Sequence, residues 1–193
     1  MASQDRLIGH TLGRYTIESL LGRGGLAAVY KANDLLWEVP VAVKILPEFF
    51  ATEEEHRQRF QREASTMANL IHPNIMPVRD YGQAEGVTYF VMDYAEGGTL
   101  EDRMRHPVSL EETARLLLPV VSAVEYAHHQ GVVHRDLKPS NVLFDAEGRP
   151  LVADFGIAKL MEESGLTRTR ESLGTPEYMA PEQAREAALV AEP

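Results

Sequence analysis

One short polar stretch, flanked on both sides by apolar residues, sets the strongest constraint on how this chain can fold. Residues 134–141 (HRDLKPSN) place one acid, two bases, an amide and a proline between Val132-Val133 and Val142–Phe144. We expect both apolar flanks to form short buried strands, which would hold the polar residues on a rigid base. A rigid loop with this mixture of proton-exchanging and charged groups is typical of a catalytic site.

Length, charge and composition narrow the class of protein. With 193 residues the chain can form one sizeable core or two small lobes. Its 29 acidic and 19 basic residues give a formal net charge of -10, which argues against nucleic acid or an anionic membrane as the main partner. The chain has no cysteine, which excludes disulfides and is compatible with a reducing cytosol. Because we find neither a signal peptide nor an apolar run of membrane-spanning length, we expect a soluble, cytoplasmic chain.

The first half of the chain has mainly strand patterns. Five apolar or β-branched runs, separated by turn residues, predict an antiparallel sheet. A capping box at Thr52 and Glu55 and apolar residues at helical spacing predict one amphipathic helix over residues 52–70. The predicted strands cover residues 15–21, 27–32, 39–46, 75–81 and 87–94.

The pattern changes at Glu96-Gly97-Gly98-Thr99, where adjacent glycines between a strand and a helical pattern indicate a boundary. Beyond it, Ser109 and Glu112 form a second capping box at the start of a long apolar helical face. We therefore expect an α+β chain in two parts. The predicted divisions are an N-terminal extension at 1–14, a strand-rich lobe at 15–95 and a mainly helical lobe at 96–193.

Two features of the first lobe are suited to binding phosphate. Gly22-Arg23-Gly24-Gly25 lies between two predicted strands, so its backbone amides can approach phosphate oxygens; an ordinary glycine hairpin is the alternative. Lys44 stands alone in an apolar strand, where a cation requires an anion, either a phosphate or the carboxylate of Glu63 in the predicted helix. The alternative for Lys44 is a side chain that extends to solvent.

A candidate metal site lies in the second lobe. Asp154 follows the apolar run Pro150-Leu151-Val152-Ala153 and precedes Phe155-Gly156. The side chains of Asp154 and Asn141 are hard oxygen donors of the kind that Mg²⁺ uses while it keeps water and phosphate in its other positions. The alternative for Asp154 is a residue that caps the turn at the end of a strand.

The order and spacing of these motifs together are more specific than any one of them. The glycine-rich hairpin, strand lysine, helix glutamate, His-Arg-Asp loop, Asp-Phe-Gly segment and residues 174–182 (GTPEYMAPE) follow the signature order of protein kinases. Over residues 15–183 the chain resembles a bacterial eukaryotic-like protein serine/threonine kinase. The resemblance implies a two-lobe kinase fold, with a five-stranded antiparallel sheet and one main helix in the small lobe.

The resemblance also implies ATP and Mg²⁺ as cofactors and assigns roles to individual residues. Asp136 would accept the proton of the substrate hydroxyl, Lys138 would neutralise the γ-phosphate, and Asn141 with Asp154 would bind Mg²⁺. Lys44, paired with Glu63, would hold the α- and β-phosphates. The implied ATP-binding residues are Leu21, Gly22, Gly24, Gly25, Val29, Ala42, Lys44, Met92, Asp93, Ala95 and Leu143, of which Ala42 and Leu143 would sandwich the adenine.

The resemblance further predicts the substrate class and a switch. Lys138 together with Thr175, the implied substrate-positioning residue, is similar to the pattern of the serine/threonine branch. Phosphorylation of Thr167 and Thr169 would add negative charge that Arg135 could meet, which would order the loop; the alternative is a plain solvated loop. We expect protein substrates with Ser/Thr acceptors, and a possible kinase–kinase dimer for autophosphorylation.

Two departures from the family pattern leave a rival function open. Ala27 stands where the third glycine of the glycine-rich loop is expected, and the sequence stops soon after Ala180-Pro181-Glu182, so the helical lobe would be partial. Because folded domains have a stability margin of only about 5–15 kcal/mol, missing core helices matter. The rival is a truncated, non-catalytic fragment that binds nucleotide or a partner. A kinase of small molecules is disfavoured because residues 174–182 resemble a peptide-positioning loop.

Overall fold

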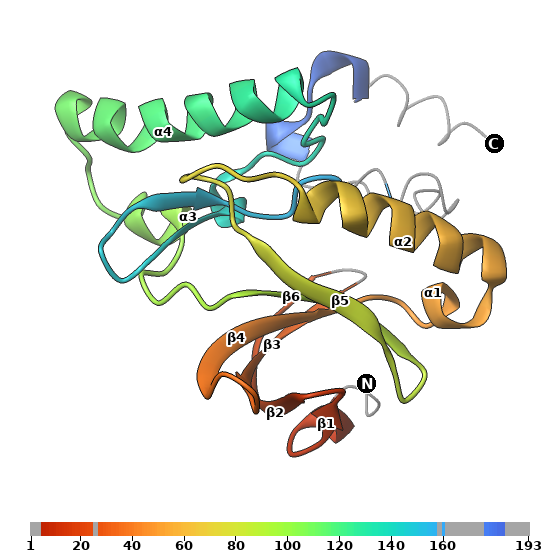
Figure 1. Cartoon of the computed structure of the whole chain (residues 1–193). Helices are drawn as coiled ribbons and strands as arrows, with labels where there is room; N and C mark the ends of the chain where they lie inside the picture. Colours follow the sequence, from red (N-terminus) through yellow and green to blue (C-terminus); the bar gives the residue numbers. More distant parts are fainter. Residues whose placement is uncertain (1–4, 25–26, 158–159, 161–175, 184–193) are drawn as a thin grey trace. The chain divides into compact units, whose positions relative to one another are not determined.

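The computed structural model describes residues 5–24, 27–157, 160 and 176–183 (Figure 1). The chain divides into two compact units. The first unit comprises Met1–Asn69 and Pro77–Tyr94, and the second comprises Leu70–Met76 and Ala95–Pro193. The short segment Leu70–Met76 therefore belongs to the second unit, although the sequence pattern had placed it in the first lobe.

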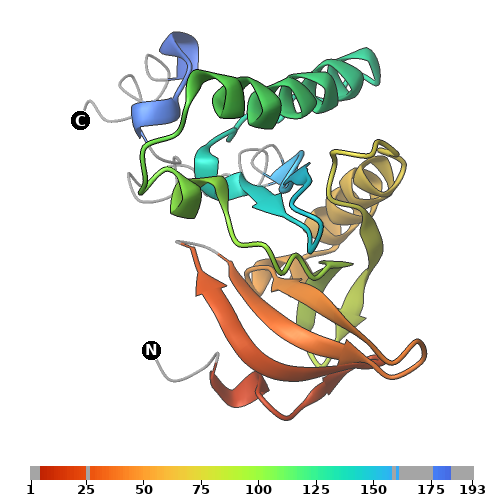
Figure 2. The same ribbon diagram turned by 90° about the vertical axis from the view of Figure 1, so that its left-hand side faces the viewer.

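The first unit contains an antiparallel sheet with the strand order β1-β2-β3-β4-β6-β5 (Figure 2). All five predicted strands are present, and the two-residue strand β1 adds a sixth from the segment predicted to be an extension. The 3-10 helix η1 (Asp5–Leu7) precedes the sheet. The strands are β1 (Thr11–Leu12), β2 (Tyr15–Arg23), β3 (Ala28–Asp34), β4 (Val39–Ile45), β5 (Val78–Ala84) and β6 (Val87–Asp93).

Strand β5 begins three residues later than the apolar run at 75–81 predicted. Ile75 forms a bridge with Val152, and the N–H of Met76 donates to the carbonyl of Val152 at 2.9 Å, so these residues pair within the second unit instead. The turn between β5 and β6 is also tighter than expected, because Gly82 lies within β5 and only Glu85-Gly86 separates the strands.

One face of this sheet forms the core of the first unit. Alternate residues of the strands point to the same side, so the buried apolar set follows the period of two that strands impose. Tyr15 closes the core by donating its hydroxyl to a carboxylate oxygen of Asp80 at 2.6 Å. Burial, together with this hydrogen bond, raises the pKa of Tyr15. The core residues are Leu12, Tyr15, Ile17, Ala28, Tyr30, Ala32, Val41, Val43, Ile45, Tyr89 and Val91.

The predicted helix over residues 52–70 is two helices, α1 (Phe49–Thr52) and α2 (Glu54–Ala68). Glu53 separates them because its backbone is extended, with φ -101° and ψ 125°. The predicted capping box is wrong: Glu53 is the N-cap of α2 and makes no side-chain cap, while Thr52 donates its hydroxyl to the carbonyl of Phe49. The amphipathic pattern is confirmed, since α2 buries Phe60, Glu63, Ala64 and Met67.

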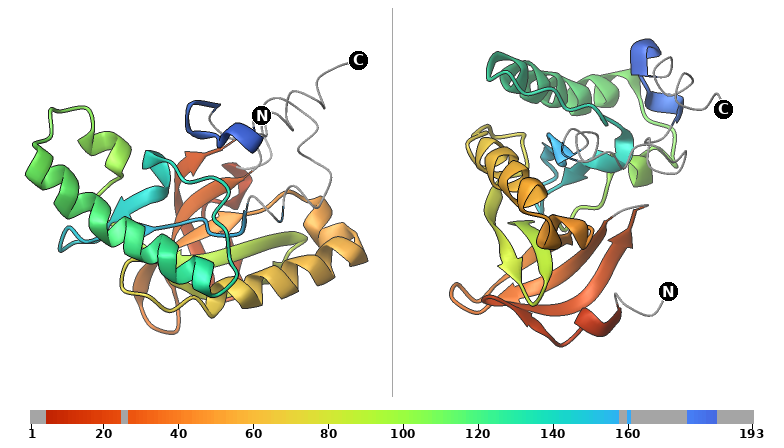
Figure 3. Two further views of the ribbon diagram at one scale, coloured as in Figure 1. Left: turned by 90° about the horizontal axis from the view of Figure 1, so that it is seen from above. Right: turned by 90° about the vertical axis from the view of Figure 1, so that its right-hand side faces the viewer.

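The second unit contains helices and one small hairpin (Figure 3). Thr99 and Asp102 form a capping box at the start of α3, and Ser109 caps α4 by accepting from the N–H of Glu112 at 3.1 Å. Among the described residues, no helix has the length and apolar character needed to cross a membrane. The elements are α3 (Leu100–Arg103), α4 (Leu110–His129), η2 (Pro139–Asn141), β7 (Val142–Phe144), β8 (Pro150–Val152) and η4 (Pro176–Tyr178).

The two apolar flanks of the polar stretch behave differently. Residues 142–144 form β7, which pairs with β8 as an antiparallel hairpin, so this prediction is confirmed. The predicted strand at Val132-Val133 is wrong, because neither residue is in a strand and Val133 is 55% exposed. Val132 is nevertheless buried in a cluster with residues of α4 and of the hairpin, and it anchors the loop through packing.

The glycine pair at the predicted boundary satisfies two different constraints. Gly98 has φ +72°, a conformation that other residues rarely adopt. Gly97 lies against the end of β7: its N–H donates to the carbonyl of Phe144 at 2.8 Å, and a Cβ at this position would lie 2.6 Å from the carbonyl oxygen of Asp145. Close backbone approach therefore explains Gly97.

We predict that Gly97→Ala destabilises the second unit by about 1–3 kcal/mol, the usual cost of forcing a methyl group into a packed site. Thermal unfolding of the chain measures this as a lower midpoint. Gly22→Ala is the matched control, because a Cβ at Gly22 would meet no atom within 4 Å. Equal midpoints for the two variants would contradict the packing explanation.

Candidate active site

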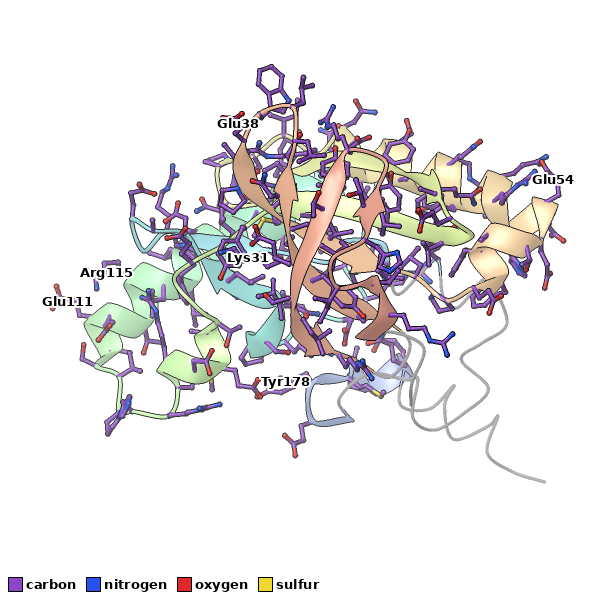
Figure 4. All side chains as sticks on the ribbon, turned by 90° about the horizontal axis from the view of Figure 1, so that it is seen from below. Lys31, Glu38, Glu54, Glu111, Arg115 and Tyr178 are labelled. Carbon is purple, nitrogen blue, oxygen red and sulfur yellow. The ribbon has the colours of Figure 1, made fainter. Side chains whose placement is uncertain are left out.

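The first unit carries a second sheet face, opposite its core, on which the predicted nucleotide-binding residues lie. Val29 of β3 is opposite Lys44 of β4, and Lys44 is opposite Phe90 of β6. Two residues along, Lys31 is opposite Ala42, and Ala42 is opposite Met92. Because alternate residues share a face, the register brings these side chains to one side of the sheet. Figure 4 labels Lys31 on this part of the sheet.

Helix α2 covers the Lys44 end of this face. The ring of Phe60 packs against Phe90, the cross-strand neighbour of Lys44, with 5.0 Å between centroids. Glu63 follows Phe60 by one helical turn and is only 6% exposed, while Lys44 is 8% exposed. Buried charges of opposite sign on facing elements favour pairing. The Nε atom of Arg62 also lies 3.5 Å from a carboxylate oxygen of Glu63.

The glycine-rich hairpin has free space at the positions where Gly22 and Gly24 lack side chains. Gly22 pairs with Val29 in the sheet, and the N–H of Gly24 donates to the carbonyl of Ala27 at 2.8 Å. Neither glycine has a positive φ, and the nearest atom to a Cβ at Gly24 would be 3.7 Å away. Neither backbone conformation nor packing within the chain therefore requires glycine at these positions. Close approach of a ligand is the remaining explanation for the two glycines. Gly25 lies outside the described residues.

The remaining predicted adenine-site residues belong to both units. Leu21 is 45% exposed on β2, and Asp93 ends β6 with its side chain paired to Arg79. Ala95 and Leu143 belong to the second unit, where Leu143 pairs with Leu151 in the small hairpin. Their shared contact with adenine stays a prediction.

In the second unit, a buried imidazole organises the polar stretch 134–141. His134 is 3% exposed; its Nε2 lies 2.8 Å from the carbonyl oxygen of Ala153, and its Nδ1 accepts from the N–H of Asp136 at 3.3 Å. A carbonyl can only accept and a backbone N–H can only donate, so the ring is neutral with its proton on Nε2. Burial lowers the pKa of His134, in keeping with the neutral form. The ring also packs against Phe155, with centroids 4.6 Å apart.

The carboxylate of Asp136 is held by two neighbours of the same loop. The Nδ2 atom of Asn141 donates to the carbonyl oxygen of Asp136 at 2.8 Å and to its Oδ2 at 3.1 Å. The Nζ atom of Lys138 lies 2.9 Å from the same Oδ2. Three of the predicted catalytic and metal-binding residues thus meet directly. These two donors fix the carboxylate in one orientation. A general base requires such a fixed orientation in order to contact a hydroxyl group.

The residues predicted to bind Mg²⁺ fit a hard divalent cation. The amide nitrogen of Asn141 donates its hydrogen bonds to Asp136, so the amide oxygen of Asn141 can act as a metal ligand. Its backbone carbonyl accepts from Ala153 at 2.9 Å, which ties the loop to the residue just before Asp154. Asp154 has φ +67°, an unusual backbone conformation for a residue other than glycine. Strained residues of this kind concentrate at functional sites.

The sequence reasoning missed two residues of this site. The motif includes His134, but the sequence reasoning gave it no role; its position directly after Val132-Val133 was the available signal. Gln183 donates from Nε2 to the carbonyl of Arg135 at 2.9 Å, and nothing in the sequence pattern pointed to it. The predicted regulatory and substrate-positioning residues Thr167, Thr169 and Thr175 lie outside the described residues.

Comparisons with known proteins identify the family to which this chain is similar. Residues 15–191 match the protein kinase domain family. The chain is 41% identical to the serine/threonine-protein kinase PrkC of Bacillus subtilis over 182 residues, which cover 93% of this chain and 28% of that protein. It is 42% identical to a probable serine/threonine-protein kinase, PknB, of Lactococcus lactis, over 89% of this chain and 28% of that protein. The chain thus spans little more than a quarter of these relatives.

Solved structures agree with the sequence comparison. A crystal structure of the kinase domain of Mycobacterium tuberculosis PknI aligns with a TM-score of 0.66 at 35% identity, covering 77% of this chain and 61% of that one. Another crystal structure of the same kinase domain aligns with a TM-score of 0.65 at 31% identity, covering 86% of this chain and 70% of that one.

The neutral state of His134 predicts a pH dependence of stability. Its pKa is lower in the folded chain than the ordinary value of 6.5, so the unfolded chain binds the proton more tightly. The stability due to the neutral ring is therefore complete above that ordinary value and is lost as pH falls through the lower folded pKa, by at most about 1.4 kcal/mol per pH unit.

The measurement compares unfolding free energies of the chain and of His134→Gln between pH 8 and pH 5. The advantage of the original chain over the variant should shrink as the pH falls. His128→Gln, at an exposed histidine, is the control for replacing a histidine by glutamine. A constant difference between the original chain and His134→Gln would mean that the ring is not buried in its neutral form.

Proposed function

Because this chain belongs to the protein kinase family, we propose that it transfers the γ-phosphoryl group of ATP to serine or threonine hydroxyls of proteins. The observation that carries the proposal is the fixed carboxylate of Asp136, oriented by Asn141 and Lys138 in one loop. The serine/threonine kinases among its relatives support the substrate class.

In the first unit, the proposed task is to hold the nucleotide. The hairpin that contains Gly22 and Gly24 would cover the phosphates, and Lys44, paired with Glu63, would hold the α- and β-phosphate oxygens. Ala42 and Met92, opposite each other in the register, would form an apolar surface for the adenine. A cation in an apolar strand requires an anion, and a bound phosphate would meet this requirement together with Glu63.

In the second unit, the proposed task is the chemistry. The substrate hydroxyl oxygen forms a bond to the γ-phosphorus while the bond from that phosphorus to the bridging oxygen of ADP breaks. Asp136 orients the hydroxyl and takes up its proton, and Lys138 neutralises charge on the transferred group. Mg²⁺ held by Asn141 and Asp154 would balance the charge of the phosphate oxygens. Catalysis then depends mainly on position and charge, which suits a loop held as rigidly as this one.

The proposed setting follows from the substrates. We propose that the reaction takes place in the cytoplasm, where ATP and Mg²⁺ are available. The net charge of -10 disfavours nucleic acid as an acceptor. We further propose that two copies of the chain meet when one phosphorylates the other at Thr167 or Thr169. Arg135, beside Asp136, would then contact the new phosphate and order the loop that carries it.

We predict that Asp136→Asn lowers the rate of phosphoryl transfer from Mg-ATP by at least ~100-fold, because the proton acceptor is lost while the shape is kept. Transfer of labelled phosphate to a generic protein acceptor measures the rate, and the thermal midpoint should change little. Glu111→Gln, on the exposed surface of α4 labelled in Figure 4, is the control for removing one negative charge. Nucleotide binding without transfer by the original chain would instead support a non-catalytic fragment.

We predict that Thr167→Ala/Thr169→Ala, made together, lowers activity by about tenfold, which corresponds to a coupling of ~1.4 kcal/mol. The reason is that the loop then cannot acquire the charge that Arg135 would meet. Mass spectrometry after incubation with Mg-ATP identifies the phosphorylated sites, and Thr66→Ala, at an exposed threonine of α2, is the matched control. If an active chain leaves both threonines without phosphate, the switch is ruled out.

A further inference from the structure

We propose that Gln183 is a positioning residue for the reaction: its side chain fixes the peptide group that joins Arg135 to Asp136, and through it the catalytic carboxylate. The proposal rests on the proposed kinase function. Gln183 would not touch ATP or the substrate. It would act through the backbone that carries Asp136.

The carboxamide of Gln183 uses both of its ends. Its Nε2 donates to the carbonyl oxygen of Arg135 at 2.9 Å, and its Oε1 accepts from the N–H of Ala180 at 3.1 Å. The two partners determine the orientation of the amide, because a carbonyl oxygen can only accept and a backbone N–H can only donate. The side chain therefore links the segment 176–183 to the catalytic loop, within the second unit.

The carbonyl that Gln183 binds belongs to the same planar peptide group as the N–H of Asp136. That N–H donates to Nδ1 of His134 at 3.3 Å. One peptide plane is thus held at its oxygen by Gln183 and at its nitrogen by His134. Because the peptide group is rigid, a rotation of this plane would break both hydrogen bonds at once.

The peptide plane between Arg135 and Asp136 requires these hydrogen bonds because the backbone of Arg135 is in an unfavourable conformation. Arg135 has φ +66°, in the left-handed region that residues with a side chain seldom occupy. Such a conformation persists only where the surroundings fix it. A relaxed Arg135 would turn the following peptide and carry Asp136 with it. Asn141 and Lys138 hold the carboxylate of Asp136, and Asn141 also holds its carbonyl oxygen. Gln183 and His134 hold the peptide group that precedes Asp136.

The neighbouring residue cannot replace Gln183 in this role. Glu182 carries a carboxylate, which has no hydrogen to donate to a carbonyl oxygen when it is ionised. The same reasoning supplies a test substitution. Gln183→Glu keeps an acceptor for the N–H of Ala180 and nearly the same shape, but it replaces the donor facing Arg135 by an oxygen. Only the contact that the proposal depends on is lost.

The experiment compares the chain with Gln183→Glu at pH 8, where the new side chain is ionised. Steady-state assays give kcat and the KM for ATP, and NMR-detected hydrogen exchange gives the protection of the Asp136 amide. Gln61→Glu, at an exposed position of α2, is the matched control for the added charge. The exchange measurement needs no turnover, so it decides the proposal even if the chain proves inactive.

We expect Gln183→Glu to lower kcat by ~10-fold or more, because small displacements of a catalytic group have large effects, while the KM for ATP changes less than about twofold. The amide of Asp136 should exchange faster in this variant, and Gln61→Glu should match the original chain. Unchanged protection of the Asp136 amide would overturn the proposal. So would a loss of kcat that Gln61→Glu reproduces. Absence of transfer by the original chain would contradict the kinase function alone.

Discussion

The buried, neutral imidazole of His134 is the interaction on which the second unit depends. It accepts from the N–H of Asp136, lies within hydrogen-bonding distance of the carbonyl of Ala153, and packs on the ring of Phe155. The residue that would take the proton and the segment that leads to the proposed metal ligand Asp154 are therefore fixed to one ring. A solvated loop would place these groups with a spread of positions, whereas phosphoryl transfer requires one. The buried ring therefore gives the polar residues around it defined positions.

In the first unit, the register of the strands positions the residues of the proposed ligand site. Its sheet has one face for the core and one for the proposed ligand, and the register assigns residues to each. Lys44 and Ala42 lie two residues apart and share the ligand face, while Val43 between them is fully buried in the core. A shift of one residue would exchange the two faces completely. The core thus protects the proposed site, since the register cannot slip without exposing Val43.

Much of this was predictable from sequence, and the reasons are specific. Strand alternation and the motif order identified the sheet, α2 and the Asp136 loop, because period-two patterns and close spacing are local signals. The interruption of the predicted helix at Glu53 was missed because no residue type at this position indicates an extended backbone. Val133 was wrongly placed in a strand because two valines favour a strand wherever they occur. The contact of Gln183 with Arg135 joins residues far apart in sequence, so no local pattern could reveal it.

The segment Leu70–Met76 has a consequence for how the chain can be assembled and recombined. It lies between two stretches of the first unit, yet it bonds to Val152 of the second. During synthesis this segment emerges before Val152, so the hydrogen bonds that join Asn74 and Met76 to Val152 form only after residue 152 has emerged. An exchange of lobes between relatives cannot be made with one crossover after Tyr94; it needs junctions at 69/70, 76/77 and 94/95. Recombination in evolution would meet the same restriction, which favours inheritance of the two units together.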